Sequence, residues 1–301
     1  MTDRPAVLVL GGTGQIGHEA VRALAWVGPV AAPTRQDANL EQASVVRELV
    51  RRVKPTVIVN AAGYTAVDAA ESNVDDCNRL NVELPRVLAE ESRRLGALMV
   101  HFSSDYVFDG TKRTPYFESD EPNPLSVYGA SKLAGEMAVA ESAGTYLIFR
   151  TSWVYATRGR NFPLTILRLA REREELRIVS DQVGAPTSAS AIAAAVSAVL
   201  RVVHPAHEVA SGVYHLSADG ATTWFEFART IVADDPRPNE QVCRAVLPIA
   251  TAEYPTAARR PAYSVLDNSK LAERFGVRLA SWRDQWQETV VELSGVGTAG
   301  A

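Results

Sequence analysis

A tyrosine and a lysine four residues apart, Tyr128 and Lys132, are the side chains in this sequence best suited to proton transfer. Residues four apart on a helix lie on the same face. A positive charge beside a phenol favours the phenolate and moves a pKa of about 10 toward neutrality. Such a phenol can protonate an oxygen while a hydride reaches the adjacent carbon. The same spacing also occurs by chance on surface helices, so the surrounding sequence has to separate the two interpretations.

A glycine-rich segment near the N-terminus has the form of a phosphate-binding turn. Residues 6–10 are a continuous apolar run, typical of a buried parallel strand, and residues 18–27 have the pattern of an amphipathic helix. Gly11, Gly14 and Gly17 lie around the junction. Glycine lets the backbone turn tightly against a pyrophosphate, and the N–H groups at the start of a helix receive its charge. The segment predicts a dinucleotide-binding site, with a purely structural turn as the alternative.

The end of the second expected strand, residues 30–33, bears on the choice of dinucleotide. In a dinucleotide-binding fold this point faces the adenosine ribose, where an acidic residue favours NAD and an arginine accommodates the extra phosphate of NADP. Arg35 follows the strand, which favours NADPH, although NADH stays open. Asp37 is close by and points the other way.

Apolar runs and amphipathic segments alternate along the first half of the chain, as in an α/β fold with a doubly wound parallel sheet. Further strands are expected at 56–59, 98–102 and 146–149, and helices at 41–53, about 75–95, 162–175 and 189–203, with another bearing Tyr128 and Lys132. From Gly212 onward, short mixed elements fit a smaller C-terminal substrate-binding lobe. We expect residues 1–155 plus about 183–205 to form the Rossmann-type dinucleotide-binding domain, and about 156–182 plus 206–301 to form that lobe.

Composition narrows the class of protein. The chain has 301 residues and a formal net charge of −4, which gives no basic footprint for nucleic acid or an acidic membrane. Two cysteines are too few for a disulfide framework. No apolar stretch reaches the ~20 residues that span a bilayer, so we expect a cytoplasmic protein.

The Gly/Ala-rich last few residues are expected to be disordered. Trp282 and Trp286, one helical turn apart, are expected to pack in the core.

Seven segments resemble the dTDP-4-dehydrorhamnose reductase family of the extended short-chain dehydrogenase/reductase superfamily. They are GGTGQIG (11–17), NAAGYTAVDAAE (60–71), HFSSDYVFDG (101–110), VYGASKLAGE (127–136), FRTSWVYA (149–156), SDQVGAPT (180–187) and YPTAARRP (254–261). The resemblance implies a reductase that moves hydride from NADPH or NADH to the 4-keto group of dTDP-4-dehydro-6-deoxy-L-mannose, giving dTDP-L-rhamnose.

Three catalytic roles follow from the resemblance. Tyr128 becomes the proton donor, Lys132 lowers its pKa and bonds the nicotinamide ribose, and Ser104 holds the substrate carbonyl oxygen. Two hydroxyl donors aimed at an oxygen that gains negative charge would stabilise the transition state. The alternative for Ser104 is a strand-end serine that bonds its own backbone.

The resemblance also assigns binding residues. Those for the dinucleotide are Gly11, Gly14, Gln15, Ile16 and Gly17 at the pyrophosphate; Arg35, Asn39 and Leu40 at the adenosine; Ala61, Ala62, Gly63, Tyr64 and Thr65 on the ribose side; and Tyr128 with Lys132. Those for the substrate are Ser104, Asp105, Tyr128, Trp153 and Arg260. Asn39 stands where relatives usually carry Asp. Trp153 has a core role as its alternative, and Arg260 a solvated loop role. Asp68 and Glu71 are interpreted as a charged helix start.

Three questions of function and assembly stay open in the sequence. Some relatives pair through a metal held by acidic residues, but here the matching stretch is Ser188-Ala189-Ser190, without a carboxylate. We therefore expect no catalytic metal, and a monomer or homodimer, with a structural metal at an interface left open. The substrate could be a related 4-keto nucleotide sugar of antibiotic glycosylation, such as the precursor of dihydrostreptose. A non-catalytic regulatory subunit that binds the dinucleotide is the third interpretation.

Overall fold

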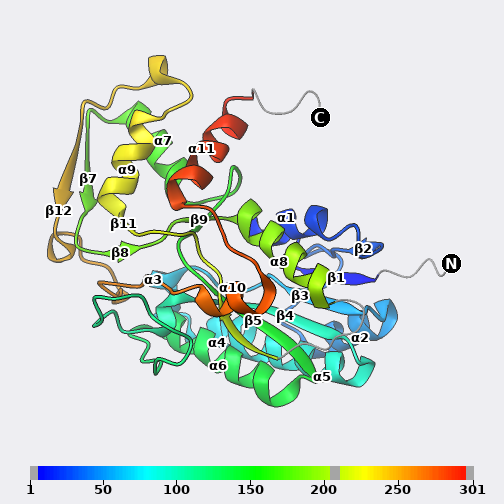
Figure 1. Ribbon diagram of the computed structural model, residues 1–301. Helices are drawn as coiled ribbons and strands as arrows, with labels where there is room; N and C mark the ends of the chain where they lie inside the picture. The colour runs from blue at the N-terminus through cyan, green and yellow to red at the C-terminus, as the bar shows by residue number, and fades with distance from the viewer. Residues whose placement is uncertain (1–5, 204–210, 296–301) are drawn as a thin grey trace.

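A six-stranded parallel sheet forms the centre of the computed structural model, which describes residues 6–203 and 211–295 (Figure 1). Its strand order is β10-β5-β4-β3-β1-β2. These strands are β1 (Val7–Leu10), β2 (Val30–Ala31), β3 (Val57–Asn60), β4 (Leu98–Ser104), β5 (Thr145–Thr151) and β10 (Gly212–His215). The chain leaves β1 toward β2 and then crosses back to β3 on the other side of β1. Ligands of open α/β sheets bind where the strand order reverses in this way.

Helices cover both faces of the sheet. Figure 1 shows α1 (Gln15–Ala23) and α8 (Ala189–Val203) above it, and α2 (Ala43–Val53), α5 (Leu84–Leu95) and α6 (Val127–Ser142) below it. The expected doubly wound α/β class is therefore correct. Of the helices in the described parts of the chain, none has the length and apolar character that a membrane crossing requires.

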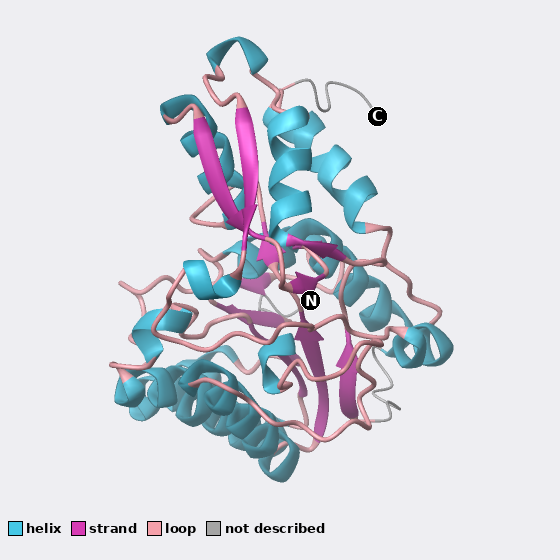
Figure 2. Cartoon of the chain, turned by 90° about the vertical axis from the view of Figure 1, so that its left-hand side faces the viewer, coloured by secondary structure: helices cyan, strands magenta, loops and turns pink. Residues whose placement is uncertain are grey.

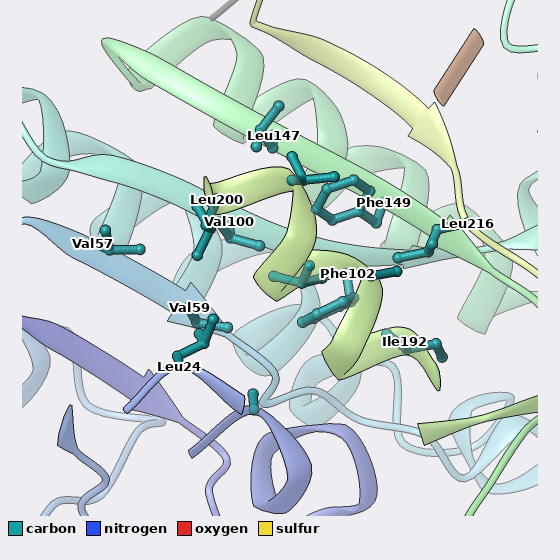
Figure 3. Close-up of a cluster of buried hydrophobic side chains, with 14 of the residues drawn as sticks. Leu24, Val57, Val59, Val100, Phe102, Leu147, Phe149, Ile192, Leu200 and Leu216 are labelled. Atoms are coloured by element: carbon teal, nitrogen blue, oxygen red, sulfur yellow. The ribbon is translucent and has the colours of Figure 1, made fainter. Parts of the chain in front are cut away.

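The alternation of side chains along each strand explains why the apolar runs are continuous. Val7 and Val9 face the cluster under α1 and α8, whereas Leu8 and Leu10 face the cluster under α2 and α5. Successive strand residues point to opposite faces, so a strand buried on both sides must be apolar throughout. Figure 3 shows the first cluster, in which Ile192 and Leu200 of α8 lie against strand residues that include Val100, Phe102 and Phe149.

A second, smaller group of elements, called here the small lobe, stands apart from the main sheet (Figure 2). It contains the parallel pair β7 (Glu175–Val179) and β12 (Ala245–Ile249) with helices α7 (Phe162–Glu172), α9 (Trp224–Ala233) and α11 (Trp282–Leu293). Its core includes Tyr155, Phe227, Trp282 and Trp286, all buried. The prediction that the two tryptophans pack in the core is confirmed.

The remaining elements are short. They are β6 (Val154–Tyr155), β8 (Val183–Gly184), β9 (Thr187–Ser188), β11 (Thr222–Thr223), α3 (Val67–Ala70), α4 (Val74–Asn78), α10 (Ser269–Phe275), a π-helical turn at Arg79–Glu83 and 3₁₀ turns at Asp105–Val107, Pro238–Glu240 and Thr251–Glu253.

Two expectations need correction. The helix expected over about 75–95 is instead α4, the π turn and α5 in succession, because the backbone widens by one residue around Asn81. Residues 212–215, expected in the smaller lobe, form β10 and extend the main sheet. The domain boundary expected at 205/206 lies outside the described residues. The same holds for the Gly/Ala-rich last few residues, which were expected to be disordered. The rest of the proposed domain division stays a prediction.

Candidate active site

One large cavity, of about 810 Å³, opens at the carboxyl ends of the central strands. It lies at the point where the strand order reverses, and the small lobe contributes the far wall. The segments after the first three strands in the chain form one part of the lining: Gly11 and Thr13–Ile16 after β1, Pro33–Arg35 and Ala38–Glu41 after β2, and Ala61–Gly63, Thr65 and Val67 after β3, with Leu80. The end of β4 and the turn after it contribute Phe102, Ser103, Asp105 and Tyr106, and α6 contributes Tyr128 and Lys132. The remaining lining residues are Thr151, Trp153, Val154, Arg158–Arg160 and Trp224.

The glycine turn has the close packing that a dinucleotide cradle needs. Gly11 has a φ of 81°, and a Cβ built on it would lie 2.7 Å from the backbone of Ala61 and Ala62. A Cβ on Gly17 would collide with the carbonyl oxygen of Gly11. Only glycine therefore allows the turn after β1 to lie against the segment after β3. The turn and the helix start that follows it fit a dinucleotide pyrophosphate. Gly17 supports the turn without lining the cavity.

Tyr128 lies at the start of α6, where the helix is capped and held close to β4. Ser126 Oγ accepts the backbone N–H of Gly129 at 3.2 Å, and Gly129 leaves no room for a side chain against the carbonyl of Tyr106. One turn later, Lys132 is 6% exposed and its Nζ donates to the carbonyl of Phe102 at 2.6 Å. The helix thus brings Tyr128 and Lys132 to the same cavity, as their spacing predicted.

Burial decides the proton affinities of this pair. It raises the pKa of Tyr128 to about 12, an effect larger than the lowering by the nearby Ser104 hydroxyl, and it lowers the pKa of Lys132 to about 8. The expectation that Lys132 lowers the pKa of Tyr128 is therefore wrong for this structure, because burial of the phenol raises that pKa and the lowering effect comes from Ser104. Tyr128 is neutral at pH 7, the state that a proton donor requires.

Ser104 ends β4 immediately behind the cavity lining and forms the backbone bond that the sequence offered as the alternative to a substrate role, which itself stays a prediction. Its Oγ accepts the backbone N–H of Tyr106 at 3.1 Å and so caps the following 3₁₀ turn. The same hydroxyl donates to Asp105 Oδ1 at 3.1 Å and is near enough to Tyr128 to lower the pKa of that phenol. The structure therefore brings together the three predicted catalytic residues.

Asp105 is a buried carboxylate that lines the cavity but is engaged by serines. It is 2% exposed and accepts hydroxyl groups from Ser104, from Ser152 at 2.9 Å and from Ser264 at 2.6 Å. Burial raises its pKa to about 6, although these hydroxyls lower it. The structure thus gives Asp105 a position next to the proton donor network, and its predicted substrate contact stays untested.

Trp153 forms an aromatic wall of the cavity together with a residue that sequence reasoning missed. Its φ is 45°, unusual for a residue with a side chain, and its ring stacks on that of Trp224 with centroids 3.4 Å apart and planes 5° from parallel. A Cβ on Gly184 would collide with the Trp153 ring. Trp224 begins α9 in the small lobe, so the pair joins the two walls of the cavity. No sequence spacing signalled Trp224.

Arg260 does not line the cavity. It forms an ion pair with Asp68 at 2.7 Å, and its guanidinium also donates to the carbonyl of Ala258 at 3.2 Å. Its proposed contact with a substrate diphosphate stays a prediction. The interpretation of Asp68 and Glu71 as a charged helix start is incomplete, because Glu71 ends α3 and accepts the backbone N–H of Val127 at 2.9 Å. Both acids thus connect α3 to the segments around the site.

The adenosine end of the cavity carries the residues expected there. Arg35, Asn39 and Leu40 all line it, and the Arg35 side chain is 86% exposed with Glu41 as its partner at 3.3 Å. Asp37 does not line the cavity; its carboxylate accepts the N–H and hydroxyl of Thr34, which lowers its pKa. The arginine is therefore the better placed of the two charged residues that pointed to different cofactors.

Asn81 is a second residue of the site that the sequence did not reveal. It is buried in the π turn, accepts the backbone N–H of Tyr64 at 2.8 Å and donates to Ser131 Oγ at 2.9 Å. These bonds hold the segment after β3 against α6 and near Lys132. Tyr64 is positioned by its backbone and does not line the cavity, unlike Ala61, Ala62, Gly63 and Thr65.

Comparisons with known proteins agree with this geometry. A family model described as RmlD substrate binding domain matches residues 5–294. The chain is 49% identical to a dTDP-4-dehydrorhamnose reductase of Burkholderia thailandensis, with 92% of this chain and 95% of the relative covered. It is 43% identical to one of Shigella flexneri, with 92% and 94% covered. A crystal structure of the Bacillus anthracis dTDP-4-dehydrorhamnose reductase in complex with NADP superposes with a TM-score of 0.88 at 33% identity, covering 96% and 99%.

Proposed function

We propose, from the premise that this chain belongs to the RmlD substrate binding domain family, that it is an NADPH-dependent dTDP-4-dehydrorhamnose reductase. The proposed reaction reduces the 4-keto group of dTDP-4-dehydro-6-deoxy-L-mannose to the alcohol of dTDP-L-rhamnose. The observation that carries the proposal is that Tyr128 and Lys132 line one end of a cavity that continues to the glycine turn, with Ser104 immediately behind that lining.

The dinucleotide, when bound, supplies the hydride that reaches the carbonyl carbon. The chain's own residues handle the oxygen. Tyr128, neutral because burial keeps its pKa near 12, donates its hydroxyl proton to that oxygen as negative charge develops there. Lys132 is held by the carbonyl of Phe102, and its other N–H groups remain for the cofactor ribose. Its positive charge also stabilises the phenolate left by the transfer.

The Ser104 hydroxyl is the second group proposed to contact the substrate carbonyl oxygen, and Asp105 helps to orient it. Ser104 accepts from a backbone N–H, which fixes its position at the end of β4. Asp105 competes for the Ser104 hydroxyl proton, and two further serines stabilise that carboxylate. Its ionisation therefore governs where the Ser104 proton points. Ser104 is proposed as the second donor to the substrate oxygen, a role that requires its single proton to turn from Asp105 to that oxygen.

NADPH is the proposed cofactor because Arg35 lines the adenosine end while Asp37 is turned to Thr34. The relative from Bacillus anthracis was solved with NADP. A reaction that draws on reduced nicotinamide dinucleotide agrees with the expected cytoplasmic location.

The test is oxidation of NADPH in the presence of the 4-keto-6-deoxy-L-mannose nucleotide, made in situ from dTDP-glucose by enzymes of the preceding steps. Rapid oxidation with dTDP-L-rhamnose as product supports the proposal. Oxidation only with another 4-keto nucleotide sugar, such as the dihydrostreptose precursor, would move the assignment within the same chemistry. Dinucleotide binding without reduction of any keto sugar would favour a regulatory subunit.

A further inference from the structure

The loop between β6 and α7 brings two arginines from the small lobe to the cavity. Arg158 and Arg160 are exposed, and both line the cavity. Within residues 6–203 and 211–295, neither guanidinium has a hydrogen-bond or ion-pair partner. By contrast, Arg168 and Arg171, in the following helix, are paired with carboxylates. Two unpaired cations at the edge of a binding cavity are available to a bound anion.

Asn161 fixes this loop against the glycine turn. It is 9% exposed, and its Nδ2 donates to Gln15 Oε1 at 3.0 Å and to the carbonyls of Ala156 at 2.8 Å and Arg158 at 3.1 Å. Its Oδ1 accepts the backbone N–H of Leu164 and caps α7. The same side chain therefore shapes the loop, starts the helix and joins both to the residue that begins α1.

The loop backbone itself lies close to Gln15. Gly159 has a φ of 75°, and a Cβ built on it would be 3.9 Å from Gln15 Cγ. The arginines on either side of Gly159 are thus held at the start of α1, a helix with no acidic residue in its first turn. The helix start and the loop that carries both arginines are therefore neighbours in the cavity lining, and each contributes positive charge there.

We propose that Arg158 and Arg160 bind the pyrophosphate of the dinucleotide from the side of the small lobe, opposite the glycine turn. The inference rests on the proposed function in so far as the ligand is a nicotinamide dinucleotide. The pyrophosphate is favoured over the 2′-phosphate because the loop is anchored to Gln15, whereas Arg35 lies at the adenosine end. It is favoured over the substrate diphosphate because Gln15 belongs to the turn that receives the cofactor. With Arg158 and Arg160 on one side and the glycine turn on the other, the bound cofactor would contact both the small lobe and the domain of the main sheet.

The test compares dissociation constants without any keto sugar present. Titration calorimetry would measure NADPH, NADH and dTDP binding to the wild type, to the double variant Arg158→Gln/Arg160→Gln, and to Arg173→Gln as a matched control. Arg173 is exposed at the other end of α7, outside the cavity lining. Repetition at low and high salt separates charge effects from packing.

The double variant should bind NADPH and NADH about 5- to 20-fold more weakly, by the same factor for each, because charge-assisted bonds to an exposed phosphate are partly screened. The loss should shrink at high salt, and both dTDP binding and the control should match the wild type. Unchanged dinucleotide binding would overturn the inference, as would a loss confined to NADPH or to dTDP. A different result would contradict the reductase proposal, namely a wild-type protein that binds the dinucleotide but reduces no keto sugar. A wild type that binds neither dinucleotide would overturn both.

Discussion

Asp105 should make the folding stability of this protein fall as the pH rises from about 4 to about 7. Its carboxyl group is buried, and burial raises its pKa from an ordinary 3.8 to about 6. In that interval the folded chain holds a proton on Asp105 that the unfolded chain has released. Stability must therefore fall as the pH rises, because the folded state binds more protons.

The size of the effect follows from the two pKa values. The step from 3.8 to about 6, at about 1.4 kcal/mol per pKa unit, corresponds to about 3 kcal/mol of unfolding free energy. This contribution is complete only well below pH 3.8, falls as the pH rises, and is lost by about pH 7. Other carboxylates act in the opposite direction, since hydrogen bonds hold the pKa of Asp109 at about 2 and the Arg260 partner lowers that of Asp68. The wild-type profile alone would mix these effects.

The perturbation that isolates Asp105 is Asp105→Asn, which keeps the shape and removes the titration. Urea unfolding of both proteins between pH 4 and pH 8 gives the free-energy difference, wild type minus variant, at each pH. We expect this difference to fall by about 2 kcal/mol between pH 4 and pH 7, because at pH 4 the unfolded chain still holds part of its proton on Asp105. A difference in unfolding free energy that is the same at every pH would not bear on the pKa, because the amide also changes the hydrogen bonds to three serines. A flat difference, or one that grows with pH, would refute the assignment of a raised pKa to Asp105.

Three further predictions concern the site. Ser104→Ala should lower kcat about 30- to 1,000-fold, as loss of one donor to a developing oxyanion does, while calorimetry shows NADPH bound as in the wild type; unchanged turnover would remove Ser104 from the chemistry. Arg35→Gln should raise the dissociation constant of NADPH about 3- to 10-fold and leave that of NADH unchanged, because only NADPH carries the 2′-phosphate; equal changes for both would contradict this role. Excess EDTA should leave turnover unchanged, since the proposed proton donors are hydroxyls; inactivation that added Mg²⁺ reverses would contradict the expectation that no metal is needed.

The sheet and its flanking helices were predictable because both faces of the sheet are covered. The run at residues 6–10 had to be apolar at every position, and glycine had to follow it for the turn to approach the segment after β3. Each of these requirements involves residues close together in the chain, so each can be recognised from a short segment of the sequence. The spacing of Tyr128 and Lys132 is of the same kind, since one helix carries both residues.

The features that the sequence did not reveal depend on contacts between distant segments. Asn161 and Gln15 are 146 residues apart, and Arg260 and Asp68 are 192 apart. No spacing rule indicated that Arg260 would find a carboxylate, or that Trp224 would stack on Trp153. The π turn around Asn81 was hidden for a different reason, because a helix with one widened turn has nearly the same apolar pattern as a regular one.

The sign of the Tyr128 pKa shift was also beyond the sequence. The neighbouring lysine was visible in the sequence, but the burial of the phenol was not, and burial is the largest cause of the shift in its pKa. The correction strengthens the chemical role, because a proton donor must hold its proton at the working pH. It also changes the part played by Lys132, from lowering the pKa of the free enzyme to stabilising the charge that appears after the transfer.

The most direct test of the central claim is the rate of NADPH oxidation by Tyr128→Phe with the 4-keto-6-deoxy-L-mannose nucleotide, measured beside NADPH binding to the same protein. The phenylalanine fills the same space and removes only the proton donor. The account predicts dissociation of NADPH as in the wild type and a turnover rate reduced at least about 100-fold. Turnover at the wild-type rate would show that the proton comes from elsewhere and would contradict the mechanism.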